Sequence, residues 1–320
     1  MTADLRRRYR RRRSMVLLSA ILVVLLVLHV FVQDGRLSTV VSTVRHAVTS
    51  VWRGSSPSGS KAASSAVESD STDSDAADSD AGSSIAKASS VPDATSTKNL
   101  TAGLTTSLDS IFSGATYAVD VIDMSTGGTV VGIDTGTRYT SASTYKLFVA
   151  YSMISAVESG EKTWDSELNG QTLRSCVATM IVDSDNDCPV AWLEEQGYGE
   201  VNQQVHDAGF DDTTIENQNM STTASDLADY LTRLHQGSFM DADSRSMLLG
   251  YMKTQVYRSG VPTGIGSNGT AADKVGFLDG LLHDASIIYT TKGDYVMVVL
   301  ADGSSWASIA QAASTIYAAL

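Results

Sequence analysis

Cysteine and histidine are scarce in this sequence, with two cysteines and five histidines among 320 residues. The two cysteines are Cys176 and Cys188. No cysteines or histidines have a metal-ligand spacing such as C-x-x-C or H-x-x-x-H. A zinc site is therefore not expected, and no metal or cofactor is implied. None of His206, His235 and His283 lies near a nucleophile turn of the G-x-S-x-G type, which disfavours a serine–histidine–aspartate triad.

Basic residues are also scarce beyond the N-terminal end. Residues 1–53 hold ten arginines and two acidic residues, whereas residues 98–320 hold eleven basic and twenty-seven acidic residues. The formal net charge of the whole chain is -13. A nucleic-acid partner requires a basic face for its phosphates, so the acidic C-terminal region argues against nucleic acid as a partner.

The N-terminal end consists of a basic tail and an apolar run. Residues 1–14 carry arginines at positions 6–8 and 10–13, and residues 15–32 contain no Asp, Glu, Lys or Arg. A helix of that length spans about 27 Å, close to the thickness of a bilayer core. The positive-inside rule keeps residues 1–14 in the cytoplasm. We expect an uncleaved, single-pass anchor in the cell membrane with the C-terminal region outside. The alternative, a cleaved signal peptide, lacks a small-residue cleavage site here.

Two further segments separate the apolar run from the folded region. Apolar residues of 33–53 recur at helical spacing, which predicts either an amphipathic helix on the membrane or against a partner, or a continuation of the anchor helix. Residues 54–97 are rich in Ser, Ala and Asp. With almost no large apolar residue, this segment cannot offset its ordering entropy, so we expect a disordered linker.

Residues 98–320 show the pattern of one folded domain. Period-two apolar runs predict two hairpins, with strands at 117–123, 129–134, 285–290 and 295–301. Helical spacing predicts helices at 144–160, 173–182, 189–196, 200–208, 223–236 and 306–320. This order predicts an α+β fold, an antiparallel β-sheet flanked by helices with an inserted all-helical subdomain.

A serine and a lysine open the first long helix. Ser143 and Lys146 form an S-x-x-K sequence, and residues three apart share a helix face, so the lysine can reach the serine hydroxyl. Such a base is needed because a serine hydroxyl is a poor nucleophile. Alone the motif is weak, since Ser58 and Ser84 match it in the linker, and a capping serine beside a solvated lysine would explain it equally well.

Two more motifs follow in a fixed order. Residues 184–186 read Ser-Asp-Asn, and residues 274–276 read Lys-Val-Gly at the entry to a predicted strand. The order S-x-x-K, S-D-N, K-T/S-G resembles the class A serine β-lactamases and the penicillin-binding proteins. The resemblance covers roughly residues 100–320. It extends to the helix-turn at 179–193, and the two strands after residue 276 resemble the family's sheet edge beside the substrate.

The resemblance implies catalytic roles. Ser143 would attack the carbonyl of a β-lactam, Lys146 would help to take its proton, and Ser184 would relay a proton to the leaving nitrogen. The chain is then expected to be a hydrolase acting on cyclic amides through a serine acyl-enzyme.

The same resemblance implies binding roles. Asn186 would bind the side-chain amide of the substrate. Lys274 and Gly276 belong to the substrate-binding strand, where Lys274 would supply positive charge for Ser184 and for the substrate carboxylate. The backbone N–H groups of Ser143 and Phe277 would form the oxyanion hole.

The sequence departs from the family pattern at two places. Val275 stands where the family has Thr or Ser, and losing such a hydrogen bond to a charged group costs about 1.5–3 kcal/mol. The family also holds a glutamate, and an asparagine four residues later, on a long loop that positions the hydrolytic water. Here Glu216 is the only candidate for that glutamate, position 220 is Met, and the loop is about ten residues short. Glu216 is either the base of deacylation or a solvated surface carboxylate.

The two cysteines, Cys176 and Cys188, bracket the second motif. Outside the membrane they are expected to form a disulfide, the alternative being two buried free thiols.

Three functions remain in competition. The first is a β-lactam hydrolase, and the second is a penicillin-binding-like D-Ala-D-Ala peptidase acting on peptidoglycan stems. The third is a non-catalytic, surface-tethered domain that binds wall fragments. The intact set of Ser143, Lys146, Ser184 and Lys274 disfavours the third, whereas the short loop keeps the second open.

Overall fold

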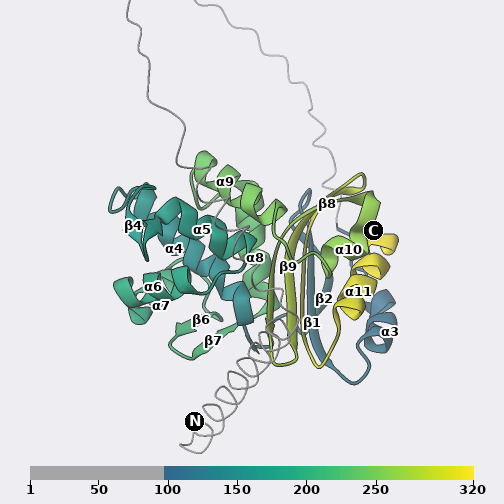
Figure 1. Cartoon of the computed structure of the whole chain (residues 1–320). Helices are drawn as coiled ribbons and strands as arrows, with labels where there is room; N and C mark the ends of the chain where they lie inside the picture. The colour runs from purple at the N-terminus through teal and green to yellow at the C-terminus, as the bar shows by residue number, and fades with distance from the viewer. Residues whose placement is uncertain (1–96) are drawn as a thin grey trace, which may run out of the picture. The chain divides into compact units, whose positions relative to one another are not determined.

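The core of the domain is a five-stranded antiparallel sheet with the strand order β2-β1-β10-β9-β8 (Figure 1). The computed structural model describes residues 97–320. The strands are β1 (Thr116–Asp123), β2 (Gly128–Ile133), β8 (Gly269–Leu278), β9 (Leu281–Thr290) and β10 (Gly293–Asp302). The two predicted hairpins are both present, as β1–β2 and β9–β10.

One feature of the sheet differs from the expectation. The two strands after residue 276, β9 and β10, were expected to form the sheet edge beside the substrate, but they lie inside the sheet. The edge is β8, the strand that carries residues 274–276. The reason is that β8 is itself a full strand that pairs with β9 along ten residues, so it displaces β9 from the edge.

Each face of the sheet is covered by its own hydrophobic core. Successive side chains of a strand point to opposite faces, so Val119 and Val121 of β1 join one core while Ala118 joins the other. The first core lies under three helices, α3 (Thr101–Ile111), α10 (Val261–Ile265) and α11 (Trp306–Ala319). The second lies under α8 (Ala224–Gln236), which packs on β1, β9 and β10.

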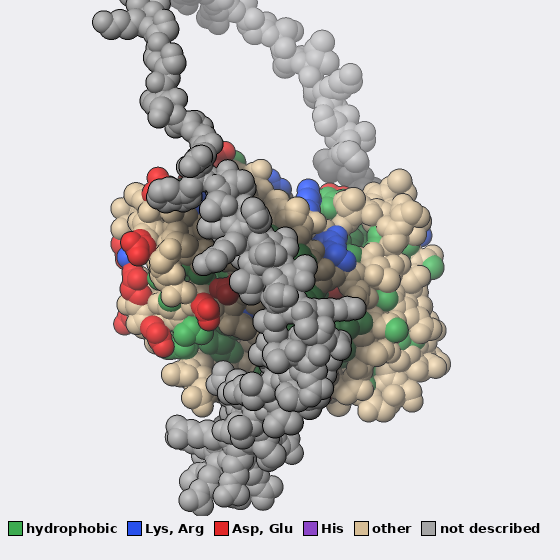
Figure 2. Space-filling view, in the orientation of Figure 1, with side chains coloured by type: hydrophobic (Ala, Val, Ile, Leu, Met, Phe, Trp, Pro, Cys, Tyr) green, Lys and Arg blue, Asp and Glu red, His purple; other side chains and the backbone are tan. Residues whose placement is uncertain are grey.

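The subdomain inserted between β2 and β8 was expected to be all-helical but is only mainly helical, because short strands also form within residues 139–222. Its other helices are α4 (Lys146–Glu158), α5 (Leu173–Val182), α6 (Asp187–Gln196), α7 (Tyr198–Asp207) and α9 (Ala242–Lys253). On the face that Figure 2 shows, the visible acidic side chains lie mostly over this subdomain. The α+β architecture of an antiparallel sheet flanked by helices, with a helical insertion, is thus confirmed for residues 97–320.

Several elements were not expected from the sequence. Helix α3 (Thr101–Ile111) is rich in Thr, Ser and Gly, which are weak helix formers, and it is held by Leu104 and Leu108, which are buried one turn apart. Helices α9 and α10 were also missed. The segment expected to be a loop near Glu216 is a hairpin of β6 (Thr214–Glu216) and β7 (Asn219–Thr222), and β7 also pairs with β3 (Tyr139–Thr140). The hairpin of two-residue strands β4 (Glu167–Leu168) and β5 (Gln171–Thr172) completes the strands.

The N-terminal segments fall outside the part of the chain that the structure describes. The basic tail at 1–14, the anchor at 15–32, the segment at 33–53 and the linker up to residue 96 therefore remain predictions. Within residues 97–320, no helix combines the length and the apolar character that a membrane crossing requires.

Candidate active site

Ser143 lies in a short 3-10 turn that leads into α4. The turn, η1 (Ala142–Tyr145), replaces the first turn of the expected helix, which begins only at Lys146. The turn is fixed from both sides, because Thr144 Oγ1 donates to Ser141 O at 2.6 Å and Ser141 N donates to Met220 O at 3.0 Å. Residues i and i+3 of a 3-10 turn are eclipsed, so the spacing of Ser143 and Lys146 still places both side chains on one side.

Lys146 is the centre of the hydrogen-bond network. Its Nζ lies within hydrogen-bond distance of four oxygens, Ser143 Oγ at 3.2 Å, Ser184 O at 2.6 Å, Ser184 Oγ at 3.2 Å and Asn186 Oδ1 at 2.7 Å. The side chain is fully buried. Burial disfavours the ammonium form and lowers the pKa of Lys146 to about 8, although the negative charge of Asp185 opposes this shift.

The turn that carries Ser184 is held in a demanding backbone conformation. Ser184 has a φ of 58°, a region that non-glycine residues seldom adopt. Asp185 Oδ2 accepts the backbone N–H groups of Asp187 and Cys188, at 3.0 and 2.9 Å, and so satisfies the start of α6. A disulfide joins Cys188 to Cys176 of α5, with a Cα–Cα distance of 5.4 Å. The two helices that flank Ser184 are therefore covalently linked.

Lys274 approaches the same serine from the sheet. Its Nζ donates to Ser184 Oγ at 3.0 Å and to Val275 O at 2.8 Å, and the side chain is fully buried. Burial lowers the pKa of Lys274 to about 7, and the charge of Lys146 lowers it further, against the opposing charges of Asp273 and Asp284. Two lysines of reduced basicity thus share one hydroxyl group.

The edge of β8 meets the serine turn at a glycine. A Cβ atom added to Gly276 would lie 2.9 Å from the backbone N of Ser143, so only glycine allows this approach. Val275 N–H donates to Gln255 Oε1 at 3.1 Å and therefore points away from β9. Because N–H groups two residues apart point to the same edge of a strand, the N–H of Phe277 also points to the free edge. The expected oxyanion-hole donors, the backbone N–H groups of Ser143 and Phe277, are thus on neighbouring segments.

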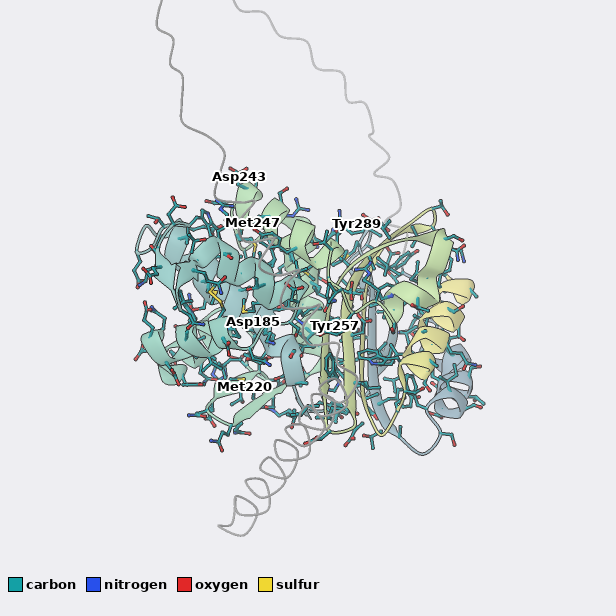
Figure 3. The ribbon with its side chains drawn as sticks, in the orientation of Figure 1. Asp185, Met220, Asp243, Met247, Tyr257 and Tyr289 are labelled. Carbon is teal, nitrogen blue, oxygen red and sulfur yellow. A yellow bond between two sulfur atoms is a disulfide. The ribbon has the colours of Figure 1, made fainter. Side chains whose placement is uncertain are left out.

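A cavity of about 580 Å³ opens over these groups. Met220 and Tyr257, both labelled in Figure 3, are part of its wall. All of its lining residues are uncharged: Thr140, Ala142, Ser143, Tyr145, Ser184, Asn186, Val190, Tyr198, Asn217, Gln218, Met220, Tyr257, Phe277 and Leu278. The two lysines lie buried beneath this lining.

Not every residue expected at the site is brought to it. Glu216 is exposed at the end of β6, and its Oε2 accepts Asn219 Nδ2 at 2.9 Å. It does not line the cavity, whereas the turn residues Asn217 and Gln218 do. Val275, expected to face the substrate in place of a hydroxyl residue, is fully buried and outside the lining.

Sequence reasoning missed several residues of the cavity wall. Tyr145 lies inside the first motif, but nothing in the sequence indicates that its side chain lines the cavity. Tyr198 and Leu278 lie at the ends of elements and Tyr257 lies in the loop between α9 and α10, and no motif marks these positions. Among the described residues, no group of three or more His, Cys, Asp or Glu side chains is arranged to hold a metal ion.

Comparison with known proteins identifies the family. The sequence model of the Beta-lactamase enzyme family matches residues 100–320, and the chain belongs to this family. No curated protein matches the sequence significantly.

Solved structures share the fold at low sequence identity. A structure of PBP-A is 23% identical, with a TM-score of 0.65 over 70% of this chain and 97% of that one. A β-lactamase from Sphaerobacter thermophilus is 20% identical, with a TM-score of 0.61 over 68% and 95% of the two chains. PenP from Rhodopseudomonas palustris, described as a putative class A β-lactamase, is 18% identical, with a TM-score of 0.63 over 68% and 100%.

Proposed function

We propose that this protein is a serine hydrolase that opens β-lactams through an acyl-enzyme on Ser143. The observation that carries the proposal is the convergence of four side chains from three separate segments. Ser143 Oγ lies 3.2 Å from Lys146 Nζ, and Ser184 Oγ lies 3.2 Å from Lys146 Nζ and 3.0 Å from Lys274 Nζ. A nucleophile, a base within hydrogen-bond reach and a second proton carrier are the parts that acyl transfer requires.

The geometry supports a specific sequence of proton transfers. Neutral Lys146 takes the proton of Ser143 as its Oγ bonds to the carbonyl carbon, and the N–H groups of Ser143 and Phe277 stabilise the oxyanion. The C–N bond then breaks, and the nitrogen receives a proton from Ser184 Oγ. Ser184 is in turn reprotonated from Lys146, so that the base returns to its neutral form. Water releases the acyl group in a second step.

In the proposed mechanism Asn186 orients the substrate. Its Oδ1 accepts the hydrogen bond from Lys146, which fixes the amide and leaves its NH₂ group at the wall of the cavity. In the proposal this group donates to the side-chain amide of the substrate, and Lys274 acts through Ser184 rather than at the surface of the cavity.

A second candidate is a penicillin-binding-like peptidase that acts on peptidoglycan stems and releases β-lactams slowly. Two observations favour it. The cavity wall is uncharged, and Glu216 lies outside it, so the hydrolytic water has no carboxylate on that wall to activate it. Among proteins of the same fold, a mutant of PBP-A is described as an acyl-enzyme complex with penicillin G.

We also propose that the domain works outside the cell membrane, held by residues 15–32. The support is the charge pattern of residues 1–32 and the disulfide between Cys176 and Cys188, since disulfides persist in oxidising compartments.

The test is a mass measurement of the purified protein with penicillin G, combined with turnover of a chromogenic cephalosporin. We expect an adduct of one penicillin on Ser143 and no adduct on Ser143→Ala. An adduct on another residue, or undiminished labelling of the variant, would exclude Ser143 as the nucleophile. Rapid turnover with an adduct that decays favours the hydrolase, whereas a persistent adduct favours the peptidase.

A further inference from the structure

Gln255 is a buried polar side chain that does not line the cavity over Ser143. It lies in the loop between α9 and α10 and is only 2% exposed. A buried amide costs free energy unless its oxygen and its NH₂ group both find partners. The hydrogen bonds of this side chain go to three consecutive residues of β8, Asp273, Lys274 and Val275.

The amide of Gln255 binds the strand on both sides of Lys274. Its Nε2 donates to Asp273 O at 2.9 Å and to Asp273 Oδ2 at 2.6 Å. Its Oε1 accepts the N–H of Val275 at 3.1 Å and lies 3.5 Å from Lys274 Nζ. Because β8 is an edge strand of the sheet, the side chain of Gln255 here takes the place of a neighbouring strand.

The orientation of this amide is fixed by its surroundings. A reversed amide would set its NH₂ group against the N–H of Val275 and its oxygen against the carbonyl oxygen of Asp273. Donor would then face donor and acceptor would face acceptor, and these contacts are unfavourable in a buried site. Gln255 therefore presents its oxygen, and not its NH₂ group, to Lys274.

The loop that carries Gln255 is also attached to the segment of Ser184. The N–H of Val256 donates to Val182 O at 3.1 Å. Val182 is the last residue of α5 and lies two residues before Ser184. Gln255 is thus held in a fixed relation to both partners of one hydrogen bond, Lys274 and Ser184.

We propose that Gln255 is a positioning residue that holds Lys274 Nζ against Ser184 Oγ. This inference rests on the proposed acyl transfer at Ser143, in which Ser184 delivers a proton to the leaving nitrogen. Three oxygens surround the Nζ of Lys274: Ser184 Oγ at 3.0 Å, Val275 O at 2.8 Å and Gln255 Oε1 at 3.5 Å. Loss of the amide frees both the strand and the lysine to shift, and a displacement of about 1 Å can slow a reaction about a hundredfold.

The test replaces Gln255 by residues that remove or keep the oxygen on the side of Lys274. Gln255→Met has a similar size and flexibility but no donor and no oxygen. Gln255→Glu keeps that oxygen, and its second oxygen can share a proton with the carboxylate of Asp273. Gln171→Met is the matched control, because Gln171 is a partly buried glutamine whose Oε1 accepts Ser175 Oγ at 2.8 Å, away from β8.

The second-order rate constant of acylation by penicillin G is measured by intact mass for the full chain and corrected for the folded fraction. We expect Gln255→Met to be slower than the wild type by about tenfold or more. Gln255→Glu should stay within about threefold of the wild type, and Gln171→Met should keep the wild-type rate. An unchanged rate in Gln255→Met, or an equal loss in Gln255→Met and Gln255→Glu, would overturn the role of Gln255.

A double-mutant cycle separates positioning from a general loss of structure. In a Lys274→Met background, Gln255→Met should cause little further loss of rate, because its effect passes through Lys274. An equal loss in both backgrounds would show that Gln255 acts elsewhere and would overturn the proposal.

If Gln255→Met does not fold, Gln255→Asn takes its place in every comparison, since it withdraws the amide by one carbon and keeps its polarity. Absence of any adduct on the wild type would overturn the proposed function itself and the role of Gln255 with it. All other outcomes named here leave the proposed function intact.

Discussion

The pH dependence of acylation tests whether Lys146 is the base that activates Ser143. Burial lowers the pKa of Lys146 from 10.5 to about 8. At pH 7, a lysine with that pKa is neutral in roughly a tenth of the molecules, which is about 300-fold more than for an unperturbed lysine. The shift corresponds to about 3 kcal/mol, and the side chain is fully buried.

The acylation rate should therefore rise with pH and level off above a midpoint of about 8. The rise follows because only the neutral amine accepts the proton of Ser143. We would measure the second-order rate of adduct formation with penicillin G by intact mass from about pH 6 to about pH 10. Ser143→Ala corrects for non-specific labelling.

A single substitution distinguishes Lys146 from the other lysine of the site. The charge of Asp185 raises the pKa of Lys146, whereas Lys274 is influenced by Lys146, Asp273 and Asp284. Asp185→Asn removes the charge but keeps an oxygen for the N–H groups at the start of α6, because asparagine is an equally good cap. The midpoint of the profile should move to lower pH, and acylation at pH 7 should become faster.

The control for Asp185→Asn is Asp183→Asn, which changes the net charge equally at an exposed position two residues away. It should leave the midpoint in place. If the midpoint stays fixed in Asp185→Asn, or if acylation does not depend on pH between about 6 and 10, then Lys146 is not the titrating base.

Three further predictions follow from particular residues. Glu216→Gln should leave the release rate of the acyl group within about twofold, because the carboxylate lies outside the cavity wall; clearly slower release in a mass time course would restore Glu216 as the base. Replacing Cys176 and Cys188 by Ala should lower the free energy of unfolding by about 3 kcal/mol, the loop-closure value for a separation of 12 residues, and an unchanged urea midpoint would contradict this. Burial raises the pKa of Asp120 from 3.8 to about 7, so the folded state holds its proton more tightly and stability falls as pH rises between about 4 and 7, by up to about 4 kcal/mol. Asp120→Asn should remove that part of the pH dependence in thermal unfolding, and an unaltered profile would refute it.

Apolar periodicity and motif spacing specify the local elements and the identity of the chemical groups. The strands of β1–β2 and β9–β10 and the helix α5 follow from apolar periodicity, which acts over neighbouring residues. The spacing of Ser143 and Lys146 places them together in an α-helix and in the 3-10 turn alike, so that contact did not depend on the exact local structure.

The position of Glu216 relative to the cavity could not be predicted from the sequence. Its position a few residues before α8 suggested a catalytic loop, but residues 214–222 form a hairpin because β7 pairs with β3. That pairing joins segments about eighty residues apart, and no pattern within residues 214–222 reveals it. The hairpin turns Asn217 and Gln218 to the cavity and leaves Glu216 exposed.

The contacts between the side chains of the site depend on packing between segments that are far apart in the sequence. Ser184 is 38 residues from Lys146 and 90 residues from Lys274, and the contacts form because β8 lies at the sheet edge against the serine turn, with Gly276 allowing the approach. The lowered pKa values of the two lysines have the same origin, since desolvation depends on everything packed around a side chain. Motifs name the groups that react, but burial and register, which involve the whole chain, set their distances and their basicity.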